Sequence, residues 1–106
     1  MTVKVKGISY AFNNEETLVI PPIALGALEQ LQKSILGFKG DVRDSSQLAT
    51  VIDVAHASLK RNYPEITRDQ VGELIDINNF IEVFECVMSI SGMQKKGDEP
   101  GEATGN

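Results

Sequence analysis

The sequence has very few of the side chains that usually carry catalysis or bind metals. Its 106 residues include no Trp, one His (His56) and one Cys (Cys86). A nucleophile and base made from these two residues would still need a third, orienting group. His56 falls at the edge of an apolar helix stripe and Cys86 on a polar helix face, so we expect a boundary histidine and an inert thiol. We predict no catalytic residues, no cofactor and no metal site, and hence a protein that is not an enzyme.

Paired cysteines and long apolar runs are also missing. A single cysteine cannot form an internal disulfide, so a cytoplasmic setting is the simplest interpretation. The first twelve residues alternate polar and apolar side chains, unlike a signal peptide. The densest apolar stretch, residues 80–90, is interrupted by Glu82, Glu85 and Ser89, and it is shorter than the roughly 20 residues that span a bilayer. We expect no membrane partner.

Basic residues are outnumbered. Ten Lys and Arg face fifteen Asp and Glu, which gives a net charge of −5. Because affinity for nucleic acid is built from Lys and Arg contacts with phosphates, this balance disfavours a nucleic-acid partner. A helix-turn-helix in the last third of the chain would present Glu82 and Glu85 to a polyanion, so that interpretation is rejected as well.

The N-terminal residues carry the period-two pattern of strands. Apolar side chains alternate over residues 3–12, with Gly7 breaking the phase as a turn or bulge would. Residues 13–16 have the composition of a turn, and the β-branched stretch after them predicts a returning strand. Pro21 and Pro22 then end the ladder because neither can donate a backbone hydrogen bond. We predict a β-hairpin over residues 1–20.

From Leu25 onward the apolar spacing becomes helical. Leu25, Leu28, Leu31 and Ile35 are predicted to share one side of a helix that ends at Gly37. Further helix starts are marked by Asp44 or Ser45, by a capping box from Thr67 to Gln70, and by Asp76 or Asn78. The expected fold is α+β, mainly α: a single globular domain over residues 1–92, with the hairpin followed by helices at about 25–36, 45–63, 68–75 and 79–91, and a flexible, disordered C-terminal tail over residues 93–106.

The last predicted helix has an unusually wide apolar face, which covers about 180° where a surface helix needs about 100°. Either this helix is central to the fold, or part of its face binds a second chain. We predict that a surface formed by Phe80, Phe84 and Met88, with the nearby Leu74, contacts another copy or a client, and that Met93 adds adaptable contact area. The alternative is that these residues only fill the core.

Two segments together resemble a known family. IPPIALGALEQL at residues 20–31 has Pro-Pro before a Leu-Gly-x-Leu helix, and ASLKRNYPEITRDQVGELIDINNFIEVFECVMSISGM covers residues 57–93. The second segment contains an Arg-Asn-Tyr-Pro-Glu-x-Thr corner, a Glu-Leu-Ile-Asp-Ile-x-Asn turn and a Val-Met-x-x-Ser-Gly ending. In this order they resemble the phage tail assembly chaperones that are encoded just upstream of the tape measure protein in long-tailed phages and prophages.

The resemblance implies a non-enzymatic assembly factor. Several copies, and hence a homo-oligomer, would bind the tape measure protein in the host cytoplasm and keep it soluble and extended during tail tube assembly. It also implies a longer, frameshifted form of the chain as a possible partner, for which an A-rich slippery heptamer would encode Lys95-Lys96. The alternative is a minor structural or connector protein of the phage tail that is retained in the virion.

Overall fold

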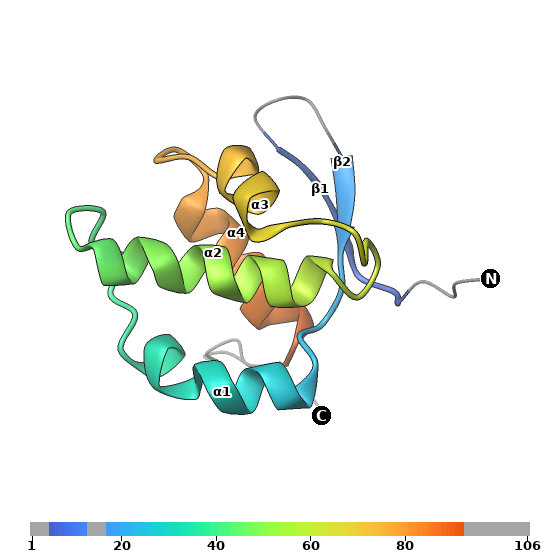
Figure 1. Ribbon diagram of the computed structural model, residues 1–106, viewed down its shortest axis with the longest axis horizontal. Helices are drawn as coiled ribbons and strands as arrows, with labels where there is room; N and C mark the ends of the chain where they lie inside the picture. Colours follow the sequence, from blue (N-terminus) through green and yellow to red (C-terminus); the bar gives the residue numbers. More distant parts are fainter. Residues whose placement is uncertain (1–4, 13–16, 93–106) are drawn as a thin grey trace.

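The predicted order of strands and helices is confirmed by the structure. The computed structural model describes residues 5–12 and 17–92 of the chain. A two-stranded antiparallel hairpin precedes four helices (Figure 1): β1 (Ile8–Ala11), β2 (Thr17–Ile20), α1 (Leu25–Leu36), α2 (Ser45–Leu59), α3 (Arg68–Leu74) and α4 (Phe80–Ile90). The predicted turn at 13–16 and the predicted tail at 93–106 lie outside the described residues.

Gly7, the residue that breaks the alternating pattern, lies directly against the end of the second strand of the hairpin. Strand β1 pairs with β2 from Ile8 opposite Ile20 to Ala11 opposite Thr17. Just before β1, a Cβ atom on Gly7 would lie 2.0 Å from the carbonyl oxygen of Ile20. Only glycine lets the two backbones approach this closely, so the broken pattern at Gly7 reflects a close backbone approach.

Residues 21–23, which follow β2, are held by three hydrogen bonds to α2 and to the residues that follow α2 and α4. Ser58 Oγ donates to the Pro21 carbonyl, and Arg61 donates to the Pro22 carbonyl over 2.8 Å. The Ile23 amide donates to Ser91 Oγ over 2.9 Å. Residues from α2, from the turn after it and from the end of α4 thus fix the segment that leads into α1.

Helix α2 begins as predicted and ends earlier. The Asp44 carboxylate accepts from the Ser46 amide over 2.9 Å, and hydrogen bonds from Ser46 lower the pKa of Asp44. The helix was predicted to reach Tyr63 but ends at Leu59, where the chain tightens into i to i+3 bonds such as that from the Asn62 amide to the Leu59 carbonyl.

The buried side chain of Asn62 ties this turn to the N-terminal segment. Its amide oxygen accepts from the Val5 N–H, and its amide nitrogen donates to the Val5 carbonyl over 2.8 Å. These bonds satisfy both backbone groups of a residue that no strand pairs. The hairpin and the end of α2 are therefore fixed relative to each other.

Helix α3 has the predicted capping box, in which Thr67 Oγ1 accepts from the Gln70 amide over 3.1 Å.

The predicted side-chain cap of α4 is wrong. Helix α4 begins after Asn79, which makes no side-chain cap. The Asp76 carboxylate instead accepts from the Asn78 and Asn79 amides and closes the preceding turn.

The core lies between the hairpin, α2 and α4, with α1 and α3 on opposite sides of α2 (Figure 1). Its largest fully buried apolar side chains come from β2, α2, α3 and α4: Ile20, Val51, Val54, Leu59, Val71, Val83 and Val87. Helix α1 contributes no buried side chain. The domain therefore folds around α2 and α4 and leaves α1 as its least covered helix.

Candidate functional site

The predicted contact surface on α4 is buried in the core. Leu74, Phe80, Phe84 and Met88 are each between 6% and 9% exposed. This burial favours the alternative interpretation, in which the residues of α4 fill the core, and Leu74, which belongs to α3, also lines the groove described below. The wide apolar arc exists because α4 is packed on several sides at once, against α2, the hairpin and the α1–α2 connector. Met93, the fifth predicted contact residue, lies outside the described residues.

An aromatic residue of the α1–α2 connector covers this face. The ring of Phe38 stacks on Phe84 with centroids 4.1 Å apart, and it meets Phe80 edge-on at 6.4 Å. Gln47 of α2 fixes the connector, because its side chain accepts from the Lys39 and Gly40 amides and donates to the Gly37 carbonyl over 3.1 Å. The sequence of the connector, with its two glycines and mixed charges, does not indicate this role.

His56 and Cys86 lie in α2 and α4, each half-buried. A ring nitrogen of His56 lies 3.1 Å from the Ile66 carbonyl oxygen, so the ring links α2 to the turn before α3. Burial, together with the charges of Glu82 and Glu85, raises the pKa of the Cys86 thiol. A raised thiol pKa makes Cys86 a poor nucleophile at neutral pH. Among residues 5–12 and 17–92, no three His, Cys, Asp or Glu side chains gather closely enough to hold a metal ion.

Exposed apolar side chains lie at both ends of α1. Leu25 and Leu36 are each 79% exposed. They are eleven residues apart, which at 100° per residue places them on one side of the helix, within about 20° of each other. Leu25 was predicted to share the inner face with Leu28, Leu31 and Ile35, but only those three pack, in part, against the core. Helix α1 thus presents two large leucines to solvent, of which Leu25 had been predicted to face inward.

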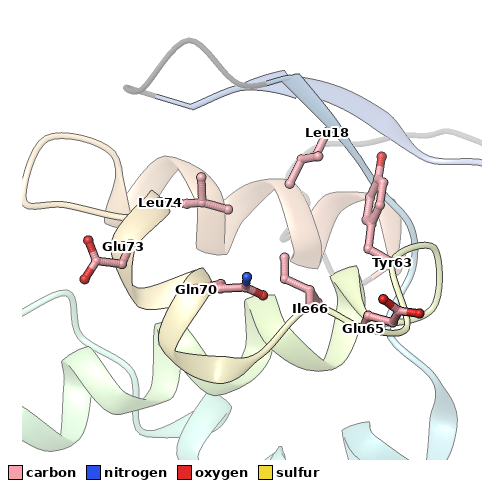
Figure 2. Close-up of a pocket in the computed structure, with 7 residues that line it drawn as sticks. All are labelled: Leu18, Tyr63, Glu65, Ile66, Gln70, Glu73 and Leu74. Atoms are coloured by element: carbon pink, nitrogen blue, oxygen red, sulfur yellow. The ribbon is translucent and has the colours of Figure 1, made fainter.

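A shallow groove of about 490 Å³ opens on another side of the molecule, between β2, α3 and the turn that joins α2 to α3. Tyr63 forms one wall, and its hydroxyl accepts from the Val19 amide of β2 over 2.9 Å. Figure 2 shows the other lining side chains: Leu18, Glu65, Ile66, Gln70, Glu73 and Leu74. The groove combines an apolar floor with two carboxylates.

Comparisons with protein families, with curated proteins and with solved structures find no match to this chain. None of the helices in the described part of the chain combines the length and the apolar character needed to cross a bilayer. The structure itself offers two candidate binding features, the exposed side of α1 and the groove beside α3.

Proposed function

We propose that this chain is a non-enzymatic phage tail assembly chaperone. Several copies bind the tape measure protein in the host cytoplasm and keep it soluble and extended while the tail tube assembles. The proposal combines the family resemblance of residues 20–31 and 57–93 with one structural observation, the exposure of apolar side chains on α1.

One of the two exposed leucines, Leu25, lies in the segment that carries the first motif of the resemblance, and Leu36 follows it in the same helix. Residues 20–31 include β2's last residue, the two prolines and the first half of α1. Hydrogen bonds from Ser58 and Arg61 hold the prolines in place, so the direction of α1 is fixed before any client binds. Leu25 and Leu36 then face solvent at the two ends of a rigid helix. Such a helix offers apolar contact area without unfolding.

The charge of the chain supports the same role. A chaperone that covers an aggregation-prone client needs apolar surface toward the client and a charged exterior that keeps the complex in solution. A net charge of −5 supplies mutual repulsion between loaded complexes. Copies bound along one long client would form an oligomer whose size follows the length of the client.

Co-expression tests the proposal. The proposal predicts a long, helical open reading frame immediately downstream of this gene. The protein that it encodes is expressed alone and together with this chain, and its soluble fraction is measured after centrifugation. The proposal predicts a soluble client only in the presence of this chain, and absence of this chain from purified virions. Its detection in washed virions at a fixed copy number would contradict the proposal and favour the retained structural component.

A further inference from the structure

The walls of the groove beside α3 are fixed by hydrogen bonds from three directions. The Tyr63 hydroxyl bonds to the backbone of β2, His56 of α2 bonds to the Ile66 carbonyl, and the Thr67 capping box sets the start of α3. A groove that is held open in this way costs little reorganisation when a ligand enters it.

The floor of the groove is apolar and its ends are acidic. Figure 2 shows Leu18, Ile66 and Leu74 between Glu73 near one end and Glu65 near the other. Both glutamates are exposed. The lining contains no Lys or Arg. A ligand that fills this groove meets aliphatic carbon in the middle and negative charge at its margins.

Neither glutamate forms an ion pair with a cation among residues 5–12 and 17–92. Arg68, the cation of α3, lies 2.6 Å from the Asp53 carboxylate and is thus directed toward α2. The other ion pair in the described residues joins Arg43 to Asp41 in the α1–α2 connector. The two carboxylates of the groove therefore have no cationic partner within the described part of the chain. A ligand that carries positive charges could form an ion pair with each of them.

We infer that the groove binds a segment of the client in which aliphatic side chains are flanked by Lys or Arg. This inference rests on the proposed function and deepens it. The exposed leucines of α1 offer apolar contact to many sequences, whereas the groove selects a segment by charge, because an acidic segment would be repelled by the glutamates and by the net charge of −5.

The test uses the folded full-length chain and a short amphipathic peptide composed of Leu, Ala and Lys. Amide chemical shifts locate the site, and calorimetry measures the dissociation constant at low and high salt. We expect shifts to concentrate on β2, on the turn at 63–66 and on α3. The double variant Glu65→Gln/Glu73→Gln is expected to bind about fivefold to tenfold more weakly, since each exposed ion pair adds a modest amount.

The matched control is Glu85→Gln/Glu102→Gln, which removes one exposed carboxylate of α4 and one from the last residues of the sequence and changes the net charge equally. It is expected to bind as the natural chain does. Equal weakening by the control would overturn the inference, because general attraction to an acidic protein would explain the binding. Equal affinity for a peptide with Glu in place of Lys would also overturn it. So would groove shifts that depend on protein concentration without peptide, since a second copy would then be the occupant.

Co-expression separates this inference from the proposed function. If the natural chain leaves the downstream client insoluble, the proposed function fails. If the natural chain solubilises the client and Glu65→Gln/Glu73→Gln does so equally well, with no peptide shifts at the groove, only the present inference fails.

Discussion

The ring of Phe38 stacks on the ring of Phe84, with centroids 4.1 Å apart and planes inclined by 27°. Phe38 belongs to the connector between α1 and α2, whereas Phe84 lies at the centre of α4. This contact places a loop residue over the apolar face of α4 and turns a candidate binding surface into core. It also links the segment that follows α1 to α4, one of the two central helices of the domain.

Replacement of Phe38 tests how much this cover contributes. Phe38→Ala removes a half-buried ring with two aromatic contacts, so we expect a loss of about 2 kcal/mol in the free energy of unfolding, measured by urea denaturation. The control Leu36→Ala removes a side chain that is 79% exposed and should change stability by less than about 0.5 kcal/mol. Equal effects of the two variants would contradict the packing described for Phe38.

Met88→Glu distinguishes a core role of the α4 face from a surface role. Met88 is 7% exposed, and an unpaired carboxylate in the core should cost more than about 4 kcal/mol. We expect loss of the cooperative thermal transition in circular dichroism. A variant that folds normally and fails only to solubilise the client would restore the surface role for Met88.

Replacing Gly7 or Gly26 with Ala should change the free energy of unfolding in opposite directions. Gly7→Ala places a Cβ 2.0 Å from the Ile20 carbonyl oxygen, so the hairpin must separate, and we expect a loss of more than about 2 kcal/mol. A Cβ on Gly26 of α1 meets nothing within 4 Å, and Gly26→Ala should stabilise the domain by about 0.5 kcal/mol through helix propensity. Thermal melts of both variants check this. Similar melting temperatures for the two would contradict the close approach at Gly7.

The link between β1 and α4 predicts a dependence of stability on alkaline pH. The Tyr10 hydroxyl donates to the Glu82 carboxylate, and burial, this hydrogen bond and the charge of Glu82 raise the pKa of Tyr10 above its ordinary 10.0. Because the folded-state pKa is the higher one, the stabilisation is complete below pH about 10 and is lost as pH rises beyond that value.

The difference in stability between the natural chain and Tyr10→Phe should therefore be constant near neutral pH and should shrink above pH about 10. Urea midpoints across this range measure the difference. A difference that stays constant into strongly alkaline solution would show that Tyr10 ionises equally in the folded and unfolded chains.

Local signals in the sequence predicted the helices well. The bounds of α1, the Asp44 cap and the Thr67–Gln70 capping box all depend on residues within one or two turns, where a side chain and the backbone it bonds are close in the chain. The early end of α2 was missed because its cause is distant: Asn62 leaves the helix and bonds to Val5, 57 residues away.

The surfaces were harder to predict. A wide apolar arc on α4 indicates how much of the helix must be covered, but nothing local shows that Phe38 covers it. Leu25 fits an apolar spacing, yet it lies at the margin of the stripe formed by Leu28, Leu31 and Ile35, and it is exposed. The groove beside α3 needs three separate segments, so no single motif could reveal it.

The exposed leucines of α1 carry the central claim, and co-expression of a double variant with the downstream tape measure candidate tests it most directly. Leu25→Glu/Leu36→Glu is compared with Gln30→Glu/Ser34→Glu, which adds equal charge to exposed positions on the other side of the same helix without removing apolar surface. Both variants should fold as the natural chain does, as judged by circular dichroism. The soluble fraction of the client is expected to fall to the level without chaperone for the leucine variant and to stay unchanged for the control variant. A client that remains fully soluble with the leucine variant would contradict the account.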